Sequence, residues 1–183
     1  RLKTLIRREI QADAEKYGDT RRSPLVERGV AAALDETELM PSEPVTVILS
    51  EKGWVRAAKG HEIDPSGLGF KAGDRYLDAV RLRSNQPAVF LDSAGRSYSV
   101  AAHTLASARG QGEPLTGRVT PPKGASFQAV LGGEPGNRYL LASDAGYGFV
   151  VELQALYAKN RAGKAVLTVP EGARVLPPAP VLN

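Results

Sequence analysis

A strand–turn–strand unit occurs three times in the chain, and this repeat constrains the fold more than any other feature. The segments "VTVILSEKGWVRA", "AVFLDSAGRSYSV" and "YLLASDAGYGFVV" each run from an apolar strand through Ser or Asp to a turn glycine and an aromatic-containing strand. The glycines are Gly53, Gly95 and Gly146, which lie 42 and 51 residues apart. Such spacing is typical of β-propeller blades. The sequence therefore predicts an all-β body with hairpins near 45–57, 88–100 and 139–151.

Each predicted hairpin is followed by a loop in which a basic residue lies close to glycine. These loops are "GLGFKAGD" (67–74), "ARGQGEPLTG" (108–117) and "KNRAGKAVL" (159–167), and the strand-like runs "YLDAVRL", "FQAVLGG" and "AVLTV" accompany them. Taken alone, residues 108–117 suggest a phosphate cradle. A P-loop would need Lys-Ser or Lys-Thr followed by a helix, whereas Pro121 and Pro122 follow here. The recurrence of the loop also argues against a single nucleotide site, so we expect three equivalent loops.

The N-terminal segment differs in character from the repeats. Leu2, Leu5, Ile6 and Ile10 fall at helical spacing, which predicts an amphipathic helix over residues 2–17 that ends at Gly18. We expect its apolar face to pack against a neighbour. The sequence starts without Met and already in helical pattern, which suggests a piece of a longer chain.

Composition narrows the classes of function. The absence of cysteine excludes disulfides, zinc ribbons and thiol catalysis, and no apolar run has the length of a membrane span or the form of a signal peptide. Residues 44–183 carry 16 basic and 11 acidic side chains, whereas residues 1–43 carry 8 and 9. The repeat region is therefore basic, which permits nucleic-acid binding without requiring it.

The basic residues near the repeated turns and loops are the candidate phosphate contacts. Glycine beside a cation lets a DNA backbone approach closely, and phosphate contacts carry no sequence information. Each charge alone is equally well explained as a solvated edge residue, and Arg109 has the further alternative of pairing with Glu113. Their recurrence in each repeat favours DNA binding by Arg56, Lys59, Lys71, Arg96, Arg109, Lys159, Arg161 and Lys164.

No catalytic or metal-binding residue is assigned from the sequence. Tyr98, Tyr139 and Tyr147 are interpreted as strand residues that cover the cores of the sheets. A metal site at His61, near Glu62 and Asp64, lacks the ligands that zinc would need. A hydrolase site at Ser107 and His103 lacks the nucleophile elbow.

Several long motifs resemble the A subunits of bacterial type IIA topoisomerases. "IRREI…EKYGDTRRSPL" is similar to the end of their breakage-reunion region. The segments "PSEPVTVILSEKGWVRAAKGHEID", "SNQPAVFLDSAGRSYSV", "SARGQGEPLTG" and "LASDAGYGFVVELQALYAKNRAGKAVLTVP" are very similar to the topoisomerase IV A subunit. The likeness extends over essentially the whole chain.

The resemblance implies a β-pinwheel, a propeller-like ring of blades that binds double-stranded DNA along a basic outer edge and bends it. It places the end of the breakage-reunion region at residues 1–28 and a truncated pinwheel of about three blades at residues 29–183. The catalytic tyrosine would lie upstream, so this fragment would hold no cofactor. The holoenzyme would use Mg²⁺ and ATP, pair with the ParE subunit, and decatenate and relax DNA.

Other expectations also follow from the resemblance rather than from the residues. It implies a cytoplasmic, chromosome-associated protein, compatible with peripheral association with the inner membrane and with control by regulatory proteins through a protein-interaction surface. A gyrase A subunit is the alternative. Gyrases carry a "QRRGGKG"-type box, whereas "SGLGFKAGD" (66–74) has no arginine pair. This departure favours topoisomerase IV and puts chiral DNA wrapping in doubt.

Overall fold

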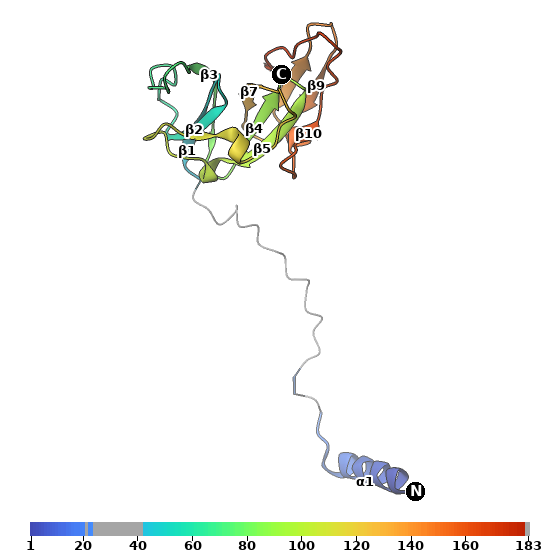
Figure 1. The fold of residues 1–183 in the computed structure, drawn as a ribbon. Coiled ribbons are helices and arrows are strands. Elements are labelled where there is room, and N and C mark those ends of the chain that lie inside the picture. Colours follow the sequence, from blue (N-terminus) through green and yellow to red (C-terminus); the bar gives the residue numbers. More distant parts are fainter. Residues whose placement is uncertain (21, 24–41, 182–183) are drawn as a thin grey trace. The chain divides into compact units, whose positions relative to one another are not determined.

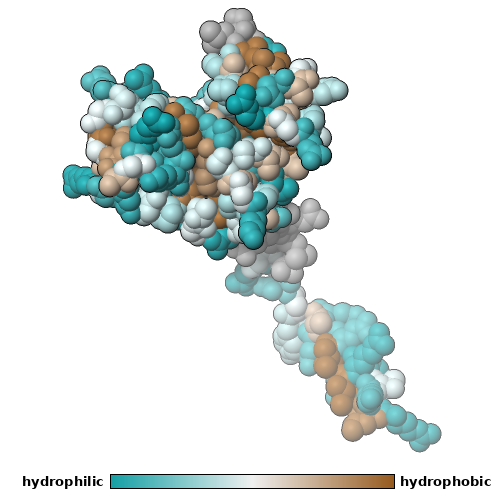
Figure 2. Space-filling model, turned by 45° about the horizontal axis from the view of Figure 1, so that its top comes forward, coloured by the Kyte–Doolittle hydropathy of each residue, from teal (hydrophilic) through white to brown (hydrophobic). Residues whose placement is uncertain are grey.

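The N-terminal unit is a single helix. The computed structural model describes residues 1–20, 22–23 and 42–181, and the chain divides into two units between residues 34 and 35. Helix α1 (Leu2–Tyr17) has the predicted bounds and ends where the Gly18 amide donates to the Ala14 carbonyl at 2.9 Å. None of its residues is buried, and Figure 2 shows its apolar stripe at the surface. The packing expected for this face is therefore not seen, and the predicted boundary at 28/29 lies outside the described residues.

The second unit consists of three antiparallel sheets (Figure 1). The first sheet has the order β3 (Tyr76–Arg83), β1 (Pro44–Ser50), β2 (Trp54–Lys59) and β6 (Glu113–Pro114). The second has the order β10 (Lys164–Ala165), β5 (Arg96–Ala101), β4 (Pro87–Asp92) and β7 (Phe127–Leu131). The third has the order β11 (Ala179–Val181), β8 (Arg138–Ala142) and β9 (Gly148–Glu152). Short 3₁₀ turns follow at Ala102–Thr104, Leu115–Gly117 and Leu153–Leu156.

The three predicted hairpins are confirmed as β1–β2, β4–β5 and β8–β9. Their turn glycines adopt positive φ angles of 76° at Gly53, 74° at Gly95 and 84° at Gly146. A side chain would strain each of these turns, which explains why all three repeats use glycine there.

A further strand pairs with the first strand of each hairpin. The predicted runs at 76–82 and 127–133 supply β3 and β7 for this purpose. The prediction for "AVLTV" (165–169) is wrong, because only Ala165 belongs to a strand and that strand, β10, pairs with β5. The Val166 and Leu167 amides both donate to the Gly95 carbonyl at 3.0 Å, which holds this segment on the second sheet. The partner of β8 is instead β11.

Two apolar cores lie between neighbouring sheets, and strand β4 contributes to both. Ala88 and Phe90 belong to the core shared with the first sheet, whereas Val89 and Leu91 belong to the core shared with the third. This alternation follows from the two-residue period of a strand. Full burial of a side chain of this size stabilises the fold by about 1.5–3 kcal/mol. The second sheet is therefore the middle layer of the stack.

Aromatic and polar contacts fix the second hairpin within the first core. The Phe127 ring meets Phe90 and Tyr98 edge-on, with centroids 6.4 and 5.8 Å apart. The buried Tyr98 hydroxyl donates to Asp92 Oδ2 at 2.7 Å, and burial raises the Tyr98 pKa so that the proton stays on the phenol. Asp92 Oδ1 also accepts the Ala94 and Arg96 amides. The carboxylate thus closes the turn that contains Gly95.

A carboxylate also joins the first and second sheets. Asp78 on β3 accepts the amide of Val130 on β7 at 2.9 Å and that of Ala79 at 2.8 Å. Burial raises the pKa of Asp78, because loss of water disfavours the ionised form. The neighbouring sheets are therefore joined by a hydrogen bond as well as by apolar packing. In the described part of the chain, no helix is both long and apolar enough to cross a membrane.

The equivalent glycines Gly95 and Gly146 allow a matched test of how the sheets are closed. A Cβ at Gly95 would lie 2.0 Å from the Leu167 carbonyl oxygen, whereas a Cβ at Gly146 would have nothing within 4 Å. Gly146→Ala should therefore cost only the positive-φ strain, about 1–2 kcal/mol. Gly95→Ala should cost about 1–3 kcal/mol more through overpacking. Urea unfolding of both variants measures the difference, and equal losses would contradict the role assigned to residues 164–167.

Candidate nucleic-acid interface

Two clusters of basic residues lie at corresponding edges of the first and second sheets. Strand β6 pairs with β2, with Glu113 opposite Val55 and Pro114 opposite Trp54. Strand β10 pairs with β5, with Lys164 opposite Ser97 and Ala165 opposite Arg96. We call β6 and β10 the closing strands, because each extends a hairpin from a loop that lies later in the chain. The loops that contain them bring cations to these two edges.

The first cation cluster surrounds β2 and contains Arg56, Lys59, Lys71 and Arg109. Lys59 and Arg109 line one hollow of about 500 Å³ together with the apolar side chains of Ile63 and Leu68. Lys59 is exposed and forms an ion pair with Glu43 at 3.2 Å. Arg109 is also exposed, and only its backbone amide has a partner among the described residues, the Ser107 hydroxyl. Its guanidinium is therefore available to an external anion.

Arg56 differs from the other members of the first cation cluster because it is 5% exposed. Its guanidinium lies 4.6 Å from the centroid of the Phe70 ring, and Nη1 donates to the Gly110 carbonyl at 3.3 Å. Burial lowers the Arg56 pKa through desolvation, and Nη2 has no partner within the described residues. These contacts hold the loops 67–74 and 108–117 against β2.

Lys71 lies over the indole of Trp54, with Nζ 3.2 Å from the ring centroid. A cation over an aromatic face is attracted by the ring quadrupole, and at exposed sites this is worth about 0.5–1 kcal/mol. Lys71 is exposed, so its ammonium remains accessible while the ring restricts its position. The aromatic residue of the first repeat thus orients a cation at the edge.

The second cation cluster surrounds β5 and contains Arg96, Lys159, Arg161 and Lys164. Arg96 donates from Nε to the Ala162 carbonyl and from Nη2 to the Gly163 carbonyl, both at 3.0 Å. Lys164 Nζ donates to the Ala155 carbonyl at 2.7 Å and remains exposed. The exposed Lys159 follows Ala158, whose amide donates to Ser99 Oγ at 3.0 Å. Lys159 has no side-chain partner in the described ranges.

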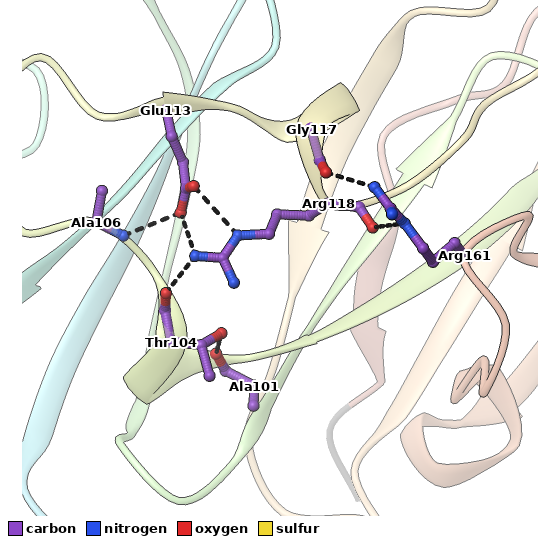
Figure 3. A network of polar contacts seen from close by, with 7 residues as sticks. All are labelled: Ala101, Thr104, Ala106, Glu113, Gly117, Arg118 and Arg161. Carbon is purple, nitrogen blue, oxygen red and sulfur yellow. Dashed lines mark hydrogen bonds and ion pairs between the residues drawn. The ribbon is translucent and has the colours of Figure 1, made fainter.

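Arg161 belongs to a network that joins three loops (Figure 3). Its Nε donates to the Arg118 carbonyl at 2.8 Å, and its Nη2 donates to the Gly117 carbonyl. Arg118 in turn binds the Glu113 carboxylate through two nitrogens, at 3.1 and 3.0 Å, and donates to the Thr104 carbonyl at 2.6 Å. Bidentate pairing of this kind fixes geometry as well as charge. Both closing loops are thereby connected.

The network answers the question left open for Arg109. Glu113 pairs with Arg118 and also accepts the Ala106 amide at 3.2 Å, so it is not the partner of Arg109. The sequence offered one signal for this pair, since both residues lie in one glycine-rich loop five positions apart. Nothing in the residue types distinguished Arg118 from Arg109 as the partner. The distinction depends on how η2 (Leu115–Gly117) turns the chain.

The loop glycines serve the fold more than access to a ligand. A Cβ at Gly112 would lie 2.5 Å from the Val55 carbonyl oxygen, and one at Gly163 would lie 2.5 Å from the Tyr98 ring. Both have positive φ angles, 83° and 69°. They therefore let the closing strands press against the hairpins. Gly110, by contrast, has only the Ser107 oxygen near it, at 3.9 Å.

The tyrosine and histidine predictions have mixed outcomes. Tyr98 is fully buried and Tyr139 is half-buried against the second core, as predicted. Tyr147 is 66% exposed, so its predicted role in covering a core is wrong. The third hairpin lacks a closing strand in the described structure, which leaves this side chain uncovered. His61 Nε2 lies 2.9 Å from the Leu82 carbonyl, and the described residues contain no group of three metal-ligating side chains.

Comparisons with known proteins relate this fold to one kind of subunit. No protein-family model matches the chain. The chain is 63% identical over 181 residues to the A subunit of DNA topoisomerase 4 from Pseudomonas aeruginosa and 56% identical over 178 residues to that from Escherichia coli. These matches cover 99% and 97% of the chain. The chain spans 24% of the length of either relative.

Solved structures give the same relation for the fold. The chain is similar to the E. coli ParC C-terminal domain, with a TM-score of 0.74 and 56% identity, over 78% of this chain and 58% of that one. The DNA gyrase A C-terminal domain matches with a TM-score of 0.54 at 15% identity, over 76% of this chain and 48% of that one. The second likeness concerns the fold alone.

Arg161 and Arg109 can be separated by stability. Arg161→Ala removes two charge-assisted hydrogen bonds to carbonyls and should lower the free energy of unfolding by about 1–2 kcal/mol. Arg109→Ala removes no described side-chain contact and should stay within about 0.5 kcal/mol of the parent. Chemical denaturation of both variants measures this. A loss at Arg109 equal to that at Arg161 would show that Arg109 is structural.

Proposed function

Because the chain belongs to the family of topoisomerase IV A subunits and its stacked sheets form part of a β-pinwheel, we propose that its β unit binds duplex DNA through the phosphate backbone. The unit would select and bend the DNA on which the whole topoisomerase acts. The observation that carries this proposal is the placement of exposed cations at the same edge of two successive sheets. A segment laid across both edges would meet positive charge in each.

The contacts divide the eight candidate residues by availability. Lys59, Lys71, Arg109, Lys159 and Lys164 are exposed, and their charged groups can reach a phosphate without disrupting the core. Arg56 is buried, while the guanidinium groups of Arg96 and Arg161 are directed to backbone carbonyls. We therefore propose that the five exposed residues contact phosphate and that the three arginines shape the edges on which those residues lie.

The physical chemistry of such an edge favours binding that is independent of base sequence. Lys and Arg contacts to phosphate release condensed counterions, so affinity falls steeply with salt. Bending a site of about 20–30 base pairs costs on the order of 1–6 kcal/mol, which the additional contacts must offset. Cations repeated from sheet to sheet supply those contacts along a curved path.

For the whole protein, we propose the activity that the names of its relatives imply. The β unit would not be catalytic by itself. The full enzyme would cleave and pass DNA with ATP and Mg²⁺ in complex with ParE, which would decatenate and relax DNA during chromosome segregation in the cytoplasm. Residues 1–28 would be the end of the breakage-reunion region and residues 29–183 the partial pinwheel.

A protein partner is the second candidate for the first cation cluster. The hollow beside Lys59 and Arg109 also exposes Ile63 and Leu68, and apolar side chains contribute little to phosphate binding. A regulatory protein with an acidic and apolar segment would fit this surface. Its binding would change less with salt than DNA binding does, which separates the two proposals.

Salt dependence and matched variants test the DNA proposal. With about six phosphate contacts, the affinity for a labelled duplex of about 25 base pairs should fall by about 10³ between 50 and 200 mM salt. The double variant Arg109→Ala/Lys159→Ala should reduce the slope of log K against log salt by about 1.8. Arg81→Ala is the control, since Arg81 is exposed on β3 at the opposite edge of the first sheet.

Fluorescence anisotropy of the labelled duplex gives all three slopes. The Arg81 variant should bind as the parent does. Binding that does not respond to salt, or an equal loss in all the variants, would contradict phosphate contact at the β2 and β5 edges.

A further inference from the structure

Corresponding positions of the three hairpins differ sharply in burial. In the first hairpin, Gly53, Val55 and Arg56 are buried and the other two residues of 53–57 are half-buried. Residues 95–99 of the second hairpin show the same pattern at the same positions. In the third hairpin, residues 146–150 are all exposed. Tyr147 is 66% exposed, Phe149 40% and Val150 51%, and Figure 2 shows apolar surface on the lobe that contains this sheet.

The closing strands account for the burial in the first two hairpins. Each closing segment has a positive-φ glycine, then two extended residues that pair with the hairpin, then an apolar residue: Gly112–Leu115 and Gly163–Val166. The amide of the apolar residue donates to the turn glycine, from Leu115 to Gly53 at 2.9 Å and from Val166 to Gly95 at 3.0 Å. The two closures are therefore the same structure built twice.

The glycine of each closing segment lies on an equivalent hairpin residue. A Cβ at Gly112 would be 3.2 Å from the Cβ of Arg56, and a Cβ at Gly163 would be 2.5 Å from the Tyr98 ring. The pairing of β8 with β9 places Phe149 opposite Leu141, as Tyr98 lies opposite Phe90. Phe149 is thus the third member of this series, without a glycine on it in the described residues.

The edge of β9 borders a hollow that matches the missing closure. The hollow has a volume of about 500 Å³ and is lined by Tyr147, Gly148, Phe149 and residues of the segment 166–170. Nothing lies within 4 Å of the Cβ position at Gly146, although the equivalent position at Gly95 faces the Leu167 carbonyl at 2.0 Å. In the described structure, β9 pairs only with β8.

We propose that the β9 edge is the docking site for a third closing segment, with the pattern glycine, two extended residues and an apolar residue. The glycine lies on Phe149, the first extended residue pairs with Gly148, and the second pairs with Tyr147. The amide of the apolar residue donates to the Gly146 carbonyl. This register transfers the two observed closures to the third hairpin without change.

The occupant is a segment of the same protein that lies outside these 183 residues. Each observed closing segment comes from the loop after the next hairpin, since β6 follows β5 and β10 follows β9. By the same rule, the third closing segment follows a fourth hairpin. The chain spans 58% of the E. coli ParC C-terminal domain that it matches, so the related domain has further sequence of the kind required. This inference does not depend on DNA binding.

Amide hydrogen exchange of the 183-residue chain and of the full-length protein tests the proposal. The edge amides between Tyr147 and Val150 should exchange quickly in the 183-residue chain and at least about tenfold more slowly in the full-length protein. Arg96 and Ser97, which β10 already closes, are the internal control and should be protected in both.

Three results would overturn the proposal. Fast exchange of β9 in both forms would mean that no segment closes this edge. Slow exchange in the 183-residue chain at every concentration would mean that the edge is already covered. Slow exchange that appears only as concentration and dimer mass rise would identify a second copy as the occupant.

Gly146→Ala tests the register independently. In the full-length protein, the added Cβ would meet the carbonyl of the closing segment, as a Cβ at Gly95 would meet Leu167. The variant should restore fast exchange at β9 and leave β5 protected. Unchanged protection of β9 would contradict the proposed register, and loss of protection at both strands would show general unfolding rather than release of one segment.

Discussion

Face-to-face packing of neighbouring sheets is the constraint on which the rest of the structure depends. No sheet has enough apolar surface in its own plane to form a core, so each must cover the next. Strand β4 shows this directly, because Phe90 faces the first core and Leu91 the second. The polar groups that join the layers, such as the Asp78 carboxylate on the Val130 amide, then have fixed partners.

This stacking also determines where the positive charge lies. A loop that returns from one hairpin to extend the preceding sheet crosses between layers, and its glycine must adopt a positive φ angle to fit against the hairpin. The cations beside that glycine are then delivered to the sheet edge. The same closing geometry thus accounts for both the stability of the edges and the charge that we propose for DNA binding.

Local features were predictable from the sequence, and contacts between distant loops were not. The helix, the three hairpins and their turn glycines follow from periodicity and turn chemistry within short windows. The misassigned strand at 165–169 depended on competition between two sheets for one segment, which no local pattern reveals. Likewise, residue type identified Arg109, Arg161 and Arg56 equally well as candidates. Only the fold shows that Arg161 binds loop carbonyls while Arg56 is buried under Phe70.

The central claim is that DNA lies across the closed edges of β2 and β5. Lysine acetylation with and without duplex DNA, read by mass spectrometry, tests it most directly, because lysines occur at both edges and on α1. The account predicts protection of Lys59, Lys71, Lys159 and Lys164 by DNA at low salt, lost as salt is raised. Lys3 and Lys16 on α1 should remain reactive. Protection of Lys3 and Lys16 while the four edge lysines stay reactive would contradict it.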